Sequence, residues 1–387
     1  MFKKRNKAIF GLSFGHFAVD LYAAMLVPLY PMITGKLGIN LALISSIIAL
    51  GHLVSSMLQP VFGYMADKLR HRVFMVWGLV LSSIFIPLAP VNTKVGGFLA
   101  CLLLGMMGNA FFHPQVSALI KDFNKNNPDL VKIMGIFLGL GTIGYAIGPC
   151  IVTSYVSYFG ADNLFYIGFF GLISAVFMYF FVPKMPDKDC YIKENFFIII
   201  KEILRNKKCM FLTLVSVVKS ALSISFGTYI PFLLEKQGFN LSSIGLIVTL
   251  FYVAGGIGTI YSSKIENKIG ANNVIAVSFM TILPLLMMFL FLINHNKNLS
   301  VILFVLSGFF ILLSVGILLT QAQNAIPKYT GVVSGVIQGF SWGIGALFLA
   351  PLGIIGQKFG VETVLILMSV IAFIIGFYTL KNKCLKD

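Results

Sequence analysis

Residues 31–41 read PMITGKLGINL and residues 231–241 read PFLLEKQGFNL, so the first segment recurs after 200 positions. Five positions have the same residue type in both segments. They are Pro31, Lys36, Gly38, Asn40 and Leu41 in the first segment. The same shift continues downstream, where it pairs Lys68 with Lys268, Gly135 with Gly335, Gly139 with Gly339, and Phe159-Gly160 with Phe359-Gly360. One constant shift along the whole chain indicates that a unit of about half its length has been duplicated.

The composition places both copies in lipid. Hydrophobic residues make up 58% of the 387 residues and charged residues 11%, and the mean hydropathy is +0.93. These values exclude a soluble enzyme. Runs of about 20 apolar residues span a bilayer as helices, and twelve runs begin near Ala8, Leu41, Val73, Val95, Val131, Leu164, Cys209, Leu241, Val274, Leu299, Gly331 and Val361. The predicted fold class is therefore an all-α membrane protein with twelve transmembrane helices in two parallel six-helix repeats.

The positive net charge follows this predicted topology. Most of the 29 basic residues lie at the termini and in the loops of one side, whereas the opposite side holds Lys36, Lys94, Lys236, Lys297 and Lys358. By the positive-inside rule, the basic side and both termini are cytoplasmic. The topology thus explains the net charge of +16. The charge gives no reason to expect a nucleic-acid partner.

The longest loop predicts the boundary between the two copies. Residues 183–208 carry seven basic residues and divide an N-terminal six-helix bundle, residues 1–182, from a C-terminal six-helix bundle, residues 209–387. Inside this linker, residues 196–204 mix apolar side chains with Lys201 and Glu202. Such a mixture suits a short helix that lies on the cytoplasmic surface of the membrane.

The chain lacks the residue pattern of a membrane-embedded enzyme. Its five cysteines are scattered without the paired spacing of metal ligands, so we expect neither a metal nor another cofactor. No pair of acidic residues lies inside one predicted span. An enzyme or a non-transporting sensor is therefore disfavoured.

Asp20 and Lys219 are the deep intramembrane charges of opposite sign. A charge at the centre of a bilayer costs about 2.5 to 3.5 kcal/mol on insertion scales, so such residues are commonly functional. Asp20 maps onto Ser220, beside Lys219, under the 200-residue shift. The two charges therefore belong to equivalent helices at similar depths and could face each other across a central cavity. A fixed ion pair that merely tolerates burial is the alternative.

Two histidines join Asp20 as candidates for proton coupling. His16 lies one helical turn before Asp20, on the same face of the first span. His113 lies at a comparable depth in the fourth span. Histidine titrates near neutral pH or donates to an anion, so we predict that Asp20, His16 and His113 couple transport to protons. For each histidine, hydrogen-bonded packing is the alternative role.

Further polar side chains in the spans are candidates for lining a substrate cavity. They are Lys219, His113, Gln59, His52, Gln321, Gln323, Asn324, Gln338 and Trp342. Such residues also serve as hydrogen-bond partners between helices, where each bond is worth about 0.6 kcal/mol on average. Both interpretations stay open.

The loop after the second span reads GYMADKLRHR over residues 63–72. It resembles the signature of the major facilitator superfamily, Gly-x-x-x-Asp followed by basic residues, although the usual glycine of the turn is replaced. The matching residues are Gly63, Asp67, Lys68, Arg70 and Arg72. The resemblance implies the major facilitator fold. Asp67 is then expected to meet the positive N-terminus of the eleventh span and to latch the two halves together.

Within that superfamily, the chain resembles the fosmidomycin-resistance type of exporter over nearly its whole length. The stretches that carry this resemblance are GHFAVD at residues 15–20, SSMLQP at 55–60, FHP at 112–114 and VSG at 333–335. Relatives often follow the His-Pro pair with an acidic residue and then an arginine, whereas this chain has Gln115, Val116, Ser117 and Ala118. The resemblance implies export and leaves the substrate open.

The fifth span carries a face of small residues. Its members Gly135, Gly139, Gly141, Gly144, Gly148 and Pro149 allow close helix packing and a bend. The segment Gly144-x-x-x-Gly148-Pro149 is similar to part of a motif of proton-coupled drug antiporters. This similarity favours export.

Together these features predict a secondary active transporter that works by alternating access. In the leading interpretation, protons are exchanged for an exported small molecule, with an anionic or phosphonate-like compound as the candidate class. Uptake of a metabolite by proton symport is the alternative. We expect a functional monomer in the inner cell membrane, with the lipid bilayer, protons and a small-molecule substrate as its partners.

Overall fold

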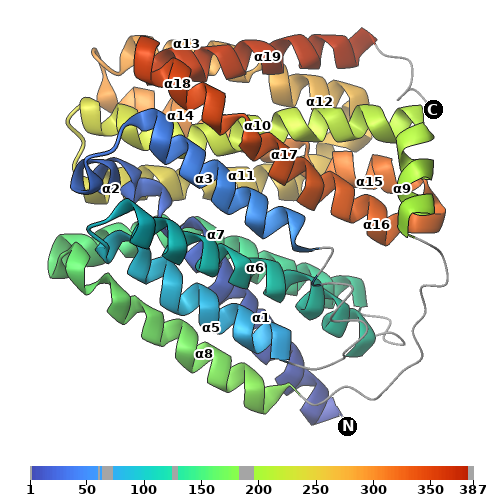
Figure 1. The fold of residues 1–387 in the computed structure, drawn as a ribbon. Helices are drawn as coiled ribbons and strands as arrows, with labels where there is room; N and C mark the ends of the chain where they lie inside the picture. Colours follow the sequence, from blue (N-terminus) through green and yellow to red (C-terminus); the bar gives the residue numbers. More distant parts are fainter. Residues whose placement is uncertain (1, 60–61, 63–72, 124–129, 183–195, 382–387) are drawn as a thin grey trace. The chain divides into compact units, whose positions relative to one another are not determined.

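The chain is helical throughout the part that the structure describes. The computed structural model describes residues 2–59, 62, 73–123, 130–182 and 196–381, and these ranges contain no β-strand (Figure 1). The helices form two compact units. The first unit holds the described residues of 1–38 and 54–191, and the second holds those of 39–53 and 192–387.

The first unit is built around α1, which packs along α7 and α8. Its elements are α1 (Phe2–Met25), η1 (Val27–Leu29), α2 (Tyr30–Leu37), α5 (Val73–Leu88), η2 (Ala89–Val91), α6 (Val95–Phe123), α7 (Leu130–Phe159), η3 (Ala161–Ile167) and α8 (Gly168–Phe181). Pro28 and Pro31 lie at the starts of η1 and α2, because a proline fits the first turn of a helix and interrupts its interior. The first span is therefore one helix in three segments.

The second unit is built around α10, which packs on α17 and α19. Its elements are α9 (Phe196–Arg205), α10 (Lys207–Lys236), α11 (Leu241–Ile269), α12 (Ala271–Met280), α13 (Ile282–Leu292), α14 (Lys297–Leu313), α15 (Val315–Ala325), η4 (Pro327–Tyr329), α16 (Thr330–Ser334), the π-helical turn η5 (Gly335–Phe340), α17 (Ser341–Leu347), α18 (Leu349–Phe359) and α19 (Val361–Lys381). The first part of α3 (Leu41–Met57) also belongs here.

The predicted membrane helices are present. Eleven segments of the described chain are long and apolar enough to cross a membrane, and α3 is a shorter apolar helix. They lie at the twelve positions expected from the sequence, so the all-α fold class is confirmed. The short helix expected at residues 196–204 is present as α9, and its position on the membrane surface stays a prediction.

Residues 39–53 contact the second unit although they lie early in the chain. The Tyr229 hydroxyl lies 3.2 Å from Ser45 Oγ and 3.1 Å from the Leu349 carbonyl oxygen. A Cβ atom at Gly353 would lie 2.6 Å from the Ser45 Cβ, so α18 and α3 touch closely at this glycine. The sequence placed this segment in the N-terminal bundle, and the boundaries 1–182, 183–208 and 209–387 stay predictions.

The duplication is visible in contacts as well as in residue types. In the first unit, Lys36 Nζ lies 2.9 Å from Asp162 Oδ1. In the second unit, Lys236 Nζ lies 2.8 Å from Glu362 Oε1. Both members of the second pair lie 200 positions after those of the first, so each copy ties the end of its first span to the start of its sixth by the same ion pair.

Each unit has a close approach of two helices at a glycine. A Cβ atom at Gly144 of α7 would collide with the Phe17 carbonyl oxygen of α1. A Cβ atom at Gly345 of α17 would lie 2.7 Å from the Ala221 backbone nitrogen and 3.0 Å from the Val217 carbonyl oxygen of α10. The π-helical turn η5 directly precedes α17, and such turns are found often at functional sites.

Three glycines of α7 differ in their packing. Gly144 and Gly148 face the backbone of α1, since a Cβ atom at Gly148 would lie 2.6 Å from the Leu21 carbonyl oxygen. These two glycines let α1 and α7 approach closely. A Cβ atom at Gly139 would meet no heavy atom of the described chain within 4 Å, and the packing role expected for Gly139 stays a prediction.

The contrast predicts opposite effects of two alanine substitutions in one helix. Gly144→Ala forces α7 away from α1, and we expect a loss of about 1 to 3 kcal/mol, typical of overpacking. Gly139→Ala is the matched control and should leave stability unchanged or slightly higher, because alanine favours the helix. The measurement is the melting temperature of each variant in detergent. Equal melting temperatures would contradict the close contact.

Candidate functional site

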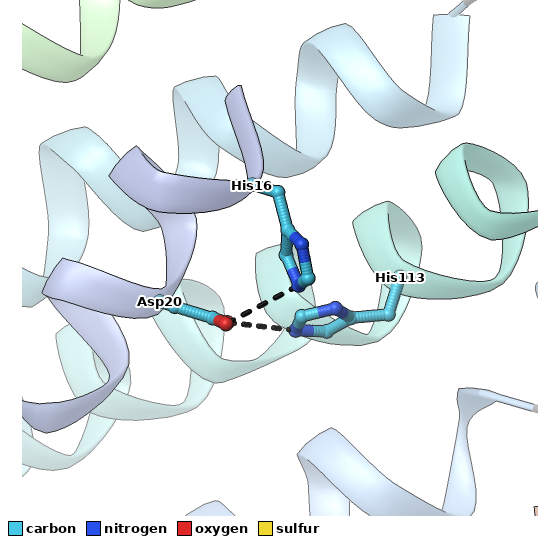
Figure 2. A group of neighbouring side chains, drawn as sticks. All are labelled: His16, Asp20 and His113. Atoms are coloured by element: carbon cyan, nitrogen blue, oxygen red, sulfur yellow. Dashed lines mark ion pairs between the residues drawn. The ribbon is translucent and has the colours of Figure 1, made fainter. Parts of the chain in front are cut away.

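One carboxylate and two imidazoles meet inside the first unit (Figure 2). His16 and Asp20 lie one turn apart on α1, and His113 comes from α6. Asp20 Oδ2 is 3.2 Å from His16 Nε2, and Asp20 Oδ1 is 3.3 Å from His113 Nε2. Each carboxylate oxygen therefore faces one imidazole, and the three residues predicted to couple protons are neighbours.

The backbone of α7 fixes the proton of His16. His16 Nδ1 lies 3.0 Å from the Phe137 carbonyl oxygen, and because a carbonyl oxygen only accepts, Nδ1 must carry the hydrogen. The second repeat supports this assignment. Ser216, 200 positions after His16, donates its hydroxyl to the Ile337 carbonyl oxygen at 2.8 Å, and Ile337 lies 200 positions after Phe137.

The hydrogen bond from His16 to Phe137 means that the contact between His16 and Asp20 needs one added proton. When Nδ1 of neutral His16 carries the hydrogen, Nε2 presents a lone pair. That lone pair would then face an ionised oxygen of Asp20 at 3.2 Å. Two acceptors at this distance repel each other, so the contact requires one added proton, either on His16 or on Asp20. The two imidazole nitrogens lie 3.2 and 3.3 Å from the two oxygens of Asp20, so one carboxylate contacts both rings.

The walls of the site are aromatic and exclude most solvent. The His16 ring stacks on Phe137 with centroids 4.2 Å apart and meets His113 edge to face at 5.2 Å. Exposed fractions of the side chains are 7% for His16, 15% for Asp20 and 25% for His113. Electrostatic interactions are stronger in such surroundings than in water. His113 is the most exposed of the three.

Gly141 and Phe137 shape the site and were not predicted as part of it. A Cβ atom at Gly141 would collide with the His16 ring and would lie 2.6 Å from Asp20 Oδ2. Gly141 therefore leaves the space that the pair occupies. The sequence showed Gly141 as one of several glycines in the fifth span. It did not show which of these glycines lies against His16 and Asp20 on α1.

A second cluster lies in the other unit. Lys219 on α10 is 6% exposed, and its Nζ lies 5.6 Å from the centroid of the Trp342 ring. Trp342 Nε1 donates a hydrogen bond to His52 Nδ1 at 3.3 Å. The structure thus brings together three residues that the sequence proposed for substrate binding. That Lys219 and Asp20 face each other stays a prediction.

Other predicted cavity residues have structural partners or stand apart. Gln321 Nε2 donates to Glu266 Oε1 at 3.3 Å, and Gln323 Nε2 donates to Ser334 Oγ at 2.8 Å. The remaining three are half-buried Gln59, just beyond α3, and the exposed residues Asn324 and Gln338. Their role in substrate binding stays a prediction.

Two further features of the sequence have different outcomes. The predicted latch residues Gly63, Asp67, Lys68, Arg70 and Arg72 lie outside the described residues. Gln115, which departs from the pattern of the exporters, has a structural contact. Its Oε1 accepts a hydrogen bond of 2.6 Å from the Met75 N–H, a group in the first turn of α5 that lacks an intrahelical partner.

Long apolar helices in two units place the chain among polytopic membrane proteins, and comparison with known families identifies the family. A model of the Major Facilitator Superfamily matches residues 12–350. The chain belongs to this superfamily. It is 25% identical to the fosmidomycin resistance protein of Escherichia coli (strain K12), a match that covers 91% of this chain and 87% of the relative. It is 22% identical to the quinolone resistance protein NorA of Staphylococcus aureus (strain COL), over 91% of this chain and 88% of the relative.

Solved structures of the superfamily share the fold. The nucleoside transporter NupG has a TM-score of 0.75 at 13% identity, with 98% of each chain covered. A bacterial homologue of the human lysosomal transporter Spinster, in an inward-facing and unoccupied conformation, has a TM-score of 0.75 at 12% identity and covers 99% of this chain and 98% of its own. Identities this low support the fold alone. The protein is therefore a transporter of the major facilitator fold and not an enzyme.

The tight fit of Gly141 predicts a local loss of function. Gly141→Ala pushes its methyl group against His16 and Asp20, and we expect transport to fall about tenfold or more, as small displacements in a preorganised site do. Transport in reconstituted vesicles is the measurement. Gly139→Ala, two residues away in the same helix, is the matched control. Unchanged transport by Gly141→Ala would contradict the described geometry.

Proposed function

We propose that the protein exports a small molecule in exchange for protons by alternating access. The observation that carries this proposal is the bond from His16 Nδ1 to the Phe137 carbonyl oxygen. It leaves a bare imidazole nitrogen facing the Asp20 carboxylate, an arrangement that is favourable only with one added proton. A buried site that needs one proton is what a proton-coupled carrier requires.

The three side chains have separate roles in the proposed cycle. Asp20 holds the negative charge that attracts the proton, and His16 shares it across the 3.2 Å contact. His113 contacts the other oxygen of Asp20 and is the most exposed of the three, so it passes the proton between the site and water. Histidine suits this step because its ordinary titration lies nearest to neutral pH.

Alternating access links this proton to transport through conformation. A proton that binds one conformation better than the other shifts the balance between the two. Asp20 with a proton is neutral and costs less to enclose in the bundle than ionised Asp20. Protonation therefore favours the conformation in which the site is closed to water.

The direction of transport is inferred from the relatives. The names of two of them refer to resistance, one to fosmidomycin and one to quinolones, and resistance by a carrier requires export. The buried charges alone also permit uptake by proton symport. Substrate counterflow in vesicles of one known orientation separates the two directions. From the distribution of basic residues, we place the termini of the monomer in the cytoplasm and the protein in the inner cell membrane.

Asp20→Asn tests the coupling. The amide keeps the size of the carboxyl group but cannot take up the proton, so we expect substrate-driven proton flux to fall to background while substrate exchange without a gradient continues. The measurement uses reconstituted vesicles that contain a pH-sensitive dye, with fosmidomycin and a quinolone as test compounds. Asp162→Asn, which alters the exposed ion pair with Lys36, is the control and should keep proton flux. Wild-type proton flux in Asp20→Asn would refute the proposal.

A further inference from the structure

Lys219 is a buried cation without an anionic partner among the described residues of its unit. Only 6% of the residue is exposed, and its recorded contact is with the ring of Trp342. No hydrogen bond or ion pair reaches its Nζ from the described residues of the second unit. An ammonium group in such a place is costly unless an opposite charge accompanies it.

The carboxylates of the second unit lie elsewhere. Four acidic residues are described there, Glu202, Glu235, Glu266 and Glu362. Glu362 pairs with Lys236, and Glu266 accepts from Gln321. Glu235 lies on the same helix as Lys219, roughly 24 Å further along it by the rise of an α-helix. Among the described residues of this unit, no carboxylate pairs with Lys219, so an anion could bind there without displacing one.

His52 holds the Trp342 ring and adds a second donor to the cluster. The indole N–H donates to His52 Nδ1 at 3.3 Å, so Nδ1 is an acceptor and the hydrogen of the neutral imidazole is on Nε2. This hydrogen bond uses the indole N–H of Trp342. The face of the indole ring stays available to Lys219 and to apolar groups. The cluster therefore offers a positive charge, an N–H donor and an aromatic surface, and none of these groups supplies a negative charge.

We propose that Lys219 binds the anionic head of the transported substrate and that the face of Trp342 packs on the apolar part beside it. The matching class is a small organic acid whose compact phosphonate or carboxylate head adjoins a short apolar or planar body. This inference rests on the proposed function, because it names the substrate of the same carrier. An oxyanion accepts charge-assisted hydrogen bonds from an ammonium group, and an apolar body beside it gains from contact with the indole.

The chain offers a direct reporter of this binding. It contains two tryptophans, and Trp77 is 56% exposed on α5, far along the chain from the cluster. Trp77→Phe leaves Trp342 as the single tryptophan, so its fluorescence reports events next to Lys219. Phenylphosphonate and benzoate are the probes, one for each type of head group, and benzyl alcohol is the uncharged analogue. The protein is purified in detergent as the full chain.

We expect a saturable change in Trp342 fluorescence with at least one of the two anions and none with benzyl alcohol. Lys219→Gln should weaken that binding about 10- to 100-fold, the usual effect of losing a charged hydrogen-bond partner. Lys219→Arg keeps the charge and should stay within about tenfold of the parent protein. The matched control is Lys264→Gln, because Lys264 also lies over an aromatic ring, with its Nζ 5.3 Å from the Tyr261 centroid, but is exposed.

The outcomes separate this inference from the proposed function. If neither anion gives a saturable change, or if Lys219→Gln and Lys264→Gln bind equally, Lys219 is not the anion site, even when vesicles show proton-driven export of another compound. If binding depends on Lys219 but no substrate drives proton flux, the proposed function fails and the anion site stands. Should Lys219→Gln not fold, Lys219→Met, which also removes the charge, takes its place: weaker binding than in Lys264→Gln would support the site, and equal affinities would overturn it.

Discussion

The hydrogen bond between His16 and the Phe137 carbonyl oxygen determines the chemistry of the first unit. Inside a bilayer, buried polar groups must find partners within the protein, and His16 Nδ1 lies 3.0 Å from the Phe137 carbonyl oxygen, to which it can only donate. The other nitrogen then has no hydrogen of its own to offer to Asp20. A contact that looks like an ordinary ion pair is therefore incomplete without an added proton. The close approach of α7 to α1, which Gly141 and Gly144 permit, is what brings the carbonyl into reach.

The two repeats keep the same scaffold and differ in their charges. The Lys36–Asp162 ion pair of the first unit recurs 200 positions later as Lys236–Glu362. The side chain that donates to a backbone carbonyl oxygen also recurs, as His16 in the first unit and Ser216 in the second. The buried charged residues do not recur, because Asp20 corresponds to Ser220 and Lys219 corresponds to Val19. Duplication supplied two similar frames, and each frame has acquired a different buried charge. The π-bulge of η5, absent from the equivalent part of α7, shows that the frames have also diverged in backbone.

The sequence was sufficient for the helices and for the side chains that carry charge. Apolar length and basic loops predict spans and orientation, and Asp20, His16 and His113 stand out because ionisable groups are rare in lipid. Phe137 could not be predicted, since its contribution is a carbonyl group that every residue has. The pairing of Trp342 with His52 joins residues 290 positions apart, and no residue type marks the π-helical turn η5. Contacts made by backbone or across long separations depend on packing that residue types do not encode locally.

A proton at Asp20 and an anion at Lys219 can be coupled without touching each other. In the proposed mechanism, each ligand neutralises a buried charge of its own unit, so each lowers the cost of enclosing that unit's polar centre. Two ligands that shift the same conformational equilibrium are linked, and the linkage is reciprocal whatever their distance. Exchange follows when the proton favours one conformation and the anion the other, because occupancy of one site then promotes release from the other. The division of charge between the repeats is therefore sufficient for coupled transport, and a direct contact between Asp20 and Lys219 is not required by this mechanism.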